Sequence, residues 1–220
     1  AHAYQQHFVT ARSLIERSIA LGRELEDMWL LGHALDSLAR LQWKQGDIQA
    51  TRALCEEVMQ SHSVTGEIRA QISPRKLLAS IALVQGDYRR AAILAKELLT
   101  IAETIGDRES QFNALFTLGE VAKSQSDDTQ ALCFYQQSLT MAHDERRNKS
   151  MALSRLGELA FRRGNHAEAI AHYNESLALA STLEDTVVVG WSLLGLARIA
   201  RAEKQYIRAA SLLGAGEASL

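Results

Sequence analysis

Proline and glycine are scarce in this sequence. One proline, Pro74, and 13 glycines occur among 220 residues. Because these two residues interrupt helices more than any others, their scarcity favours long helices. Cysteine is also rare: Cys55 and Cys133 lie 78 residues apart, far from the spacing of metal ligands. We expect both to be free thiols in a reducing cytoplasm.

Long apolar runs and an excess of charge of one sign are absent as well. No run approaches the roughly 18 apolar residues that cross a membrane, and the opening segment AHAYQQHFVTARSL lacks the pattern of a signal peptide. The formal net charge is −2, so we expect no direct binding to nucleic acid or to an anionic membrane. Because the chain begins with alanine, we expect a domain excised from a longer protein.

A turn-forming pair of residues recurs at a nearly constant interval of 40, 40, 38 and 40 residues. The pairs are Gly46-Asp47, Gly86-Asp87, Ser126-Asp127, Gly164-Asn165 and Lys204-Gln205. A small residue recurs at one position before each turn, where it would let a second helix approach closely. These residues are Ala39, Ala79, Gly119, Gly157 and Ala197.

A second small residue recurs after each turn, followed by apolar residues at three- and four-residue steps. The small residues are Thr51, Ala91, Ala131, Ala169 and Ala209. This pattern is typical of amphipathic helices. Each repeat is therefore predicted to be an antiparallel helix pair, and the pairs span 27–61, 67–104, 107–143, 145–182 and 185–220. With an unpaired helix over 4–24, about eleven helices form a single array over 1–220.

Acidic residues stand where the first helix of each pair should begin. We interpret Asp27, Glu67, Asp107, Asp185 and the pair Asp144-Glu145 as helix caps rather than catalytic groups. Pro74 lies inside one predicted first helix, where a proline costs about 3 kcal/mol. We expect this helix to kink or restart at Ser73, with 61–72 partly irregular.

The order of leucine, small residue, turn, alanine and an aromatic residue (Tyr135 or Tyr173) resembles the tetratricopeptide repeat. The period of about 40 residues exceeds the usual period of about 34. The resemblance covers essentially the whole chain and implies an all-α, right-handed superhelical solenoid of antiparallel helix pairs. It also implies a protein-interaction surface on the inner, concave face.

Three segments suggest a narrower group. IGDRESQFNALFTLGEVA, LEDTVVVGWSLLGLARIA and AASLLGAGEASL resemble the helical arrays of large bacterial LuxR-type regulators related to the maltose-regulon activator. In that group the array senses an inducer or partner and controls an ATPase or DNA-binding domain. This chain has neither a phosphate-binding loop nor a helix-turn-helix motif, so the resemblance would assign those activities to other parts of the protein.

No motif points to catalysis, a metal or a cofactor. The segment GWSLLG around Ser192 has its second glycine one place too late for a nucleophile elbow and reads as a helix. None of the seven histidines forms an H-x-x-x-H pair. We therefore predict that the chain is not an enzyme and binds no metal and no cofactor.

The candidate partner-binding residues follow from the resemblance, because the first helix of each pair lines the concave face of a tetratricopeptide array. They are His33, Asp36, Arg40, Trp43, Lys44, Lys76, Asn113, Phe116, Glu120, Lys123, Glu158, Phe161, Arg162, Trp191, Arg198 and Arg201. The same positions include Ser73, Ser80, Leu83, Val84, Met151, Ser154 and Leu194. Aromatic side chains beside arginine are common anchors of binding surfaces.

These residues favour a non-catalytic interaction and sensor module of a cytoplasmic bacterial regulator. Its groove would bind a protein segment or a small inducer. One alternative is a peptide-pheromone sensor similar to the Rap-type regulators. Another is a self-association scaffold, in which the apolar face of the last helix, with Leu212 and Leu213, pairs with a second copy.

Overall fold

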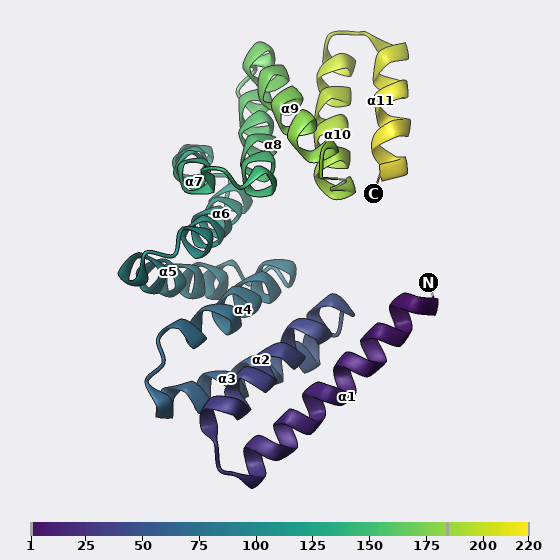
Figure 1. The fold of residues 1–220 in the computed structure, drawn as a ribbon. Helices are drawn as coiled ribbons and strands as arrows, with labels where there is room; N and C mark the ends of the chain where they lie inside the picture. The colour runs from purple at the N-terminus through teal and green to yellow at the C-terminus, as the bar shows by residue number, and fades with distance from the viewer. Residues whose placement is uncertain (1, 184, 220) are drawn as a thin grey trace. The chain divides into compact units, whose positions relative to one another are not determined.

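The computed structural model describes the backbone of residues 2–183 and 185–219 and the side chains of 9–61, 66–183 and 185–218. These residues form eleven α-helices and one short 3₁₀ helix, with no β-strand among them (Figure 1). The helices are α1 (His2–Glu24), α2 (Met28–Lys44), α3 (Ile48–Thr65), η1 (Arg69–Gln71), α4 (Ile72–Val84), α5 (Tyr88–Ile105), α6 (Arg108–Ser124), α7 (Asp128–Ala142), α8 (Arg146–Arg162), α9 (His166–Ser181), α10 (Thr186–Ala202) and α11 (Tyr206–Ser219). The predicted all-α solenoid of helix pairs is confirmed.

The helices form two compact units, Ala1–Val121 and Ala122–Leu220. The boundary between them falls inside α6 and not in a linker. In the first unit α2 packs on α1 and α3, and α4 packs on α3 and α5. In the second unit α8 packs on α7 and α9, and α10 packs on α9 and α11. The organisation of 1–220 as a single array remains a prediction.

First helices of successive pairs also touch each other within each unit. Contacts join α2 to α4 in the first unit and α8 to α10 in the second. The small residues that the repeat places on these helices are buried, with Ala39 and Ala79 at most 1% exposed. The small residues of the second helices are buried in the same way, and Ala91, Ala131 and Ala169 are inaccessible. Short side chains thus allow the close approach that stacks one pair on the next.

The five predicted turns share one backbone conformation. Gly46, Gly86 and Gly164 have φ values of 79°, 73° and 78°, in the left-handed region that glycine adopts without cost. Ser126 and Lys204 adopt φ of 62° at the equivalent places without being glycine. An L-residue is strained in this region by roughly 1–2 kcal/mol. The chain therefore stores some strain in the third and fifth turns.

Most of the predicted caps are confirmed. The carboxylates of Asp27, Asp107 and Asp185 accept hydrogen bonds from backbone N–H groups in the first turns of α2, α6 and α10. Two predicted caps are wrong. Glu67 precedes η1 and pairs with His33 at 3.5 Å. Glu145 occupies the N-cap position of α8, but its side chain makes no capping hydrogen bond.

The prediction at Pro74 is partly right. The chain leaves α3 after Thr65 and restarts as α4 at Ile72, so the irregular stretch is shorter than expected. Ser73 is not the N-cap, because Gln71 holds that position without a side-chain hydrogen bond. Pro74 lies buried in the first turn of α4, where its missing N–H has no carbonyl partner to lose.

Ser192 has a structural role, as predicted. It is inaccessible, and its hydroxyl lies 3.0 Å from both the Ser176 hydroxyl and the Val188 carbonyl, with one proton to donate to either acceptor. Ser176 in turn donates to the carbonyl of Ser150 at 2.7 Å. These bonds connect α8, α9 and α10 through satisfied buried polar groups.

Candidate functional site

Nine residues of the second unit line a pocket of about 220 Å³. They come from the C-terminal end of α6 and from α8, α9 and α10. The lining residues are Lys123, Ser154, Arg155, Glu158, Tyr173, Trp191, Leu194, Gly195 and Arg198. Six of them are residues that the sequence analysis placed on the concave face. We call this the α8–α10 pocket.

One carboxylate is shared by two cations in this pocket. The Glu158 carboxylate lies 3.3 Å from the Lys123 ammonium and 3.8 Å from the Arg155 guanidinium. Lys123 and Arg155 are only 16% and 15% exposed. Because charges in such partly buried places are weakly screened by salt, these contacts hold the three side chains in fixed positions.

An aromatic ring supports the arginine. The Arg155 guanidinium lies 4.1 Å from the centre of the Trp191 ring. A cation at this distance is attracted by the negative face of the indole. Arg155 on α8 is therefore held against α10 as well as against Glu158.

Tyr173 of α9 fills the space between the two first helices. A Cβ atom at Gly157 of α8 would lie 3.1 Å from its ring, and one at Gly195 of α10 would lie 2.1 Å from its Cζ atom. The side chain is 3% exposed, yet its hydroxyl has no hydrogen-bond partner among the described residues. Burial raises the pKa of Tyr173 to about 12; Glu158 adds to the rise, while Arg198 and Arg155 oppose it. The hydroxyl therefore stays protonated and can donate a hydrogen bond.

The other predicted residues of the second unit lie outside this pocket. Phe161 is half-buried, packs against the core around Tyr173 and stacks on His166 with ring centres 5.5 Å apart. Arg162 pairs with Asp128 at 3.1 Å. Arg201 is exposed one turn beyond the pocket. These side chains are thus engaged in structure or solvated.

The candidates on α2 belong to the first unit. His33 is 44% exposed and contacts both Glu67 and the ring of Trp29. Arg40 lies 3.9 Å from Asp36 and is itself 63% exposed. Two further candidates differ in burial. Trp43 is half-buried against the core that includes Ala39 and Leu78, whereas Lys44 is exposed.

The remaining candidates lie on α4 and α6. Lys76 contacts Glu109 at 3.9 Å, and the Asn113 amide donates to the backbone carbonyl of Glu109 at 2.8 Å. Phe116 stacks on Phe112 with ring centres 5.6 Å apart, and Glu120 is half-exposed. Phe116 therefore has an aromatic neighbour on its own helix.

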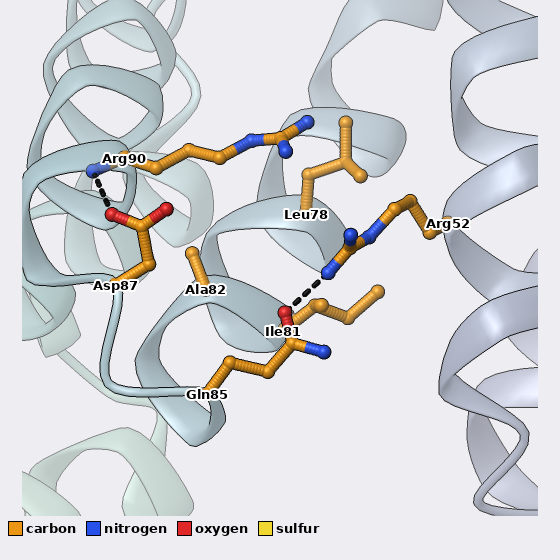
Figure 2. Close-up of a pocket in the computed structure, with 7 residues that line it drawn as sticks. All are labelled: Arg52, Leu78, Ile81, Ala82, Gln85, Asp87 and Arg90. Atoms are coloured by element: carbon orange, nitrogen blue, oxygen red, sulfur yellow. Dashed lines mark hydrogen bonds between the residues drawn. The ribbon is translucent and has the colours of Figure 1, made fainter.

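A smaller pocket of about 70 Å³ lies in the first unit (Figure 2). The Arg52 guanidinium donates to the side-chain carbonyl of Gln85, and the Asp87 carboxylate accepts from the backbone N–H of Arg90. Arg90 also contacts Glu56 at 3.4 Å. Because these groups bond one another between α3 and the α4–α5 turn, we interpret this pocket as a joint between repeats.

Sequence reasoning missed Arg155 and Tyr173 as pocket residues. Arg155 lies next to Ser154, one position away from the predicted inward face. Tyr173 belongs to a second helix, which the concave-face rule does not consider. The pairing of Tyr173 with glycines at 157 and 195 is the signal that could have revealed it, because a large ring needs small neighbours.

The described part of the chain has neither a metal site nor a membrane-spanning helix. No group of three or more His, Cys, Asp or Glu side chains there is arranged to hold a metal ion. No helix in that part combines the length and apolar character that a bilayer crossing requires. Cys55 is buried, Cys133 is exposed, and both are free thiols.

Several solved structures resemble this one in fold. BtubC (BKLC) from P. vanneervenii has a TM-score of 0.74 and 18% identity, covering 96% of this chain and 90% of that one. A putative kinesin light chain from Podosopora anserina with nearly identical tetratricopeptide-like repeats has a TM-score of 0.60 and 19% identity, covering 85% and 93%. A signal transduction ATPase with numerous domains from Pyrococcus horikoshii carries a tetratricopeptide repeat sensor. It has a TM-score of 0.66 and 17% identity, covering 93% of this chain and 35% of that one.

Sequence comparison agrees with the fold. No curated protein matches the chain significantly. The family model of the tetratricopeptide repeat matches residues 69–143 and 149–216, which is more than half of the chain. Proteins of this family generally act as scaffolds for interactions between proteins. The chain therefore belongs to the tetratricopeptide-repeat family.

Proposed function

We propose that this chain is a non-catalytic interaction module that binds a protein segment in the α8–α10 pocket. The observation that carries this proposal is the convergence of Lys123, Glu158 and Trp191, from the first helices of three successive pairs, around one cavity. Aromatic and arginine side chains dominate binding hot spots, and Trp191 with Arg155 supplies such a pair.

The size of the cavity favours a side chain of a protein over a whole small molecule. Pockets that enclose small ligands usually measure roughly 300–1,000 Å³, whereas this one measures about 220 Å³. A segment of a partner protein can insert one side chain here and lie along neighbouring helices with the rest. A whole small inducer would be less completely enclosed here than in a typical small-molecule pocket.

We propose further that the module is the sensor region of a larger bacterial transcription regulator that also contains a signalling ATPase. The likeness to the Pyrococcus ATPase supports this assignment, because in that protein a tetratricopeptide repeat sensor is part of a signalling ATPase. A cytoplasmic location fits the two free thiols. Reading the gene on both sides of this segment tests the assignment, which requires a phosphate-binding loop upstream or a DNA-binding domain downstream.

Site-specific photo-crosslinking tests the pocket. A benzoylphenylalanine is placed at Leu194, which lines the pocket, and in a matched variant at Ala171, which is exposed on α9. Cells that produce the protein are irradiated, and the crosslinked partner segment is identified by mass spectrometry. We expect a defined crosslink at position 194 and none at 171.

The identified segment is then synthesised and titrated into the purified chain by calorimetry. Truncation of a hot-spot aromatic costs about 2 kcal/mol or more, so Trp191→Ala should weaken binding about thirtyfold. Equal binding to the variant, or equal crosslinking from both positions, would show that the partner does not bind in the α8–α10 pocket.

A further inference from the structure

Two polar groups of the α8–α10 pocket lack partners within the chain. Tyr173 is 3% exposed, and its hydroxyl has no hydrogen bond among the described residues. Arg198 lines the same cavity and has no ion pair in the described part of the chain. The Tyr173 hydroxyl is not one of the buried polar atoms that lack a partner. It therefore opens to the cavity, as does the exposed Arg198, and both groups are available to a ligand there.

The charge around the cavity has one predominant sign. Lys123, Arg155 and Arg198 face it with positive charge, and Glu158 is the only acidic residue in its lining. Glu158 already occupies the space between Lys123 and Arg155. Because one carboxylate balances only one of the three cations, the lining keeps a net positive charge that attracts an anion. The whole chain has a net charge of −2, so this attraction is local to the pocket.

The geometry of the donors selects among anions. A guanidinium offers parallel N–H groups that match the two oxygens of a carboxylate. Arg155 also contacts the Trp191 ring, so this wall of the pocket is preorganised. A cavity of about 220 Å³ accepts one acidic side chain with part of its backbone.

We infer that the α8–α10 pocket binds the side-chain carboxylate of a glutamate or aspartate in a partner segment, held by the Tyr173 hydroxyl and the Arg198 guanidinium. This inference rests on the proposed function and names the chemistry that it recognises. Arg198 supplies charge and hydrogen bonds, and the Tyr173 hydroxyl adds one more donor. Trp191 and Leu194 contact the apolar part of the inserted side chain.

The test uses Trp191 as its own reporter. The chain contains three tryptophans, so Trp29→Phe and Trp43→Phe leave one indole, in the pocket. The probe is a capped pentapeptide with a central glutamate between alanines, titrated while Trp191 fluorescence is recorded. We expect a saturable change in fluorescence with the glutamate peptide. The same peptide with glutamine should bind at least about tenfold more weakly, because a charge-assisted hydrogen bond is lost.

Three variants of the chain locate the contact. Arg198→Ala should weaken binding of the glutamate peptide about tenfold, and Tyr173→Phe, which keeps the ring, about threefold or more. Arg208→Ala removes an exposed arginine of α11 that lies outside the pocket, and it should leave binding unchanged. Melting temperatures of all variants confirm that each one is folded.

The outcomes separate this inference from the proposed function. Three results would overturn the inference that the pocket binds a side-chain carboxylate. They are absence of saturable binding, equal binding of the glutamate and glutamine peptides, or no effect of Arg198→Ala and Tyr173→Phe. An alanine peptide with a free C-terminal carboxylate that binds more tightly than the capped glutamate peptide also overturns it, in favour of a chain end. In each case a partner segment crosslinked at position 194 would still support the proposed function.

Discussion

Replacing Gly195 by alanine tests the central packing contact of the second unit. The added methyl carbon would lie 2.1 Å from Cζ of Tyr173 and 2.4 and 2.6 Å from the two neighbouring ring carbons. Nonbonded carbons prefer about 3.5–4.0 Å. The ring also packs closely on α8, because a Cβ at Gly157 would stand only 3.1 Å from it, so it has little room to move away.

The magnitude follows from two opposing terms. Alanine in place of glycine in a helix interior stabilises by roughly 0.5–1 kcal/mol. Overpacking a closed site costs about 1–3 kcal/mol, and occasionally more. Since the overlap at Gly195 involves a buried ring, we expect the second term to prevail, with a net loss of about 1–2 kcal/mol. For a chain of this size, each kcal/mol lowers the melting temperature by roughly 2–4 °C.

A matched control is present on the next helix. Gly214 of α11 has open space where its Cβ would stand, so Gly214→Ala should stabilise the chain by about 0.5–1 kcal/mol. Denaturant unfolding and thermal melts compare the two variants with the parent chain. Adding Tyr173→Leu to Gly195→Ala removes the colliding ring, so the two changes should couple by more than about 0.5 kcal/mol. If Gly195→Ala is as stable as the parent while Gly214→Ala shows its gain, the contact is not as tight as described.

Three further changes test the turns, the caps and the thiols. Ser126→Gly relieves a left-handed residue and should raise the free energy of unfolding by about 1 kcal/mol in denaturant titrations; a loss of stability would contradict the strain. Asp87→Ala removes the side chain that accepts from the N–H of Arg90 and should cost about 1 kcal/mol, whereas Glu145→Ala, at a helix start without a side-chain cap, should cost little; equal losses in thermal melts would show that capping is not the cause. Burial raises the pKa of the Cys55 thiol to about 12, so at pH 8 iodoacetamide should label the exposed Cys133 and spare Cys55 in a mass-spectrometric time course; rapid labelling of both would mean that the core opens readily.

The helix pairs and their ends were predictable because their signals are local. A turn pair every 38 to 40 residues fixes where each hairpin reverses, and an aspartate three residues before an N–H fixes where a helix begins. Buried small residues such as Ala79 follow from the same periodicity. The exceptions are informative. Glu67 has the cap composition, but Pro74 shifts the start of α4 to Ile72 and leaves that glutamate to pair with His33.

The sequence by itself determined the repeat and the all-helical fold, and its resemblance to the tetratricopeptide repeat indicated the face of each first helix on which to seek binding residues. Only the tertiary structure decided which of those residues form a pocket. Lys123, Glu158 and Trp191 meet there, whereas Trp43 packs on the core and Arg162 pairs with Asp128. The pocket forms where it does because Tyr173 of α9 packs between α8 and α10, in the space that Gly157 and Gly195 leave for its ring. Such a contact between neighbouring pairs depends on side-chain shape across three helices, and a periodicity within one helix does not encode it.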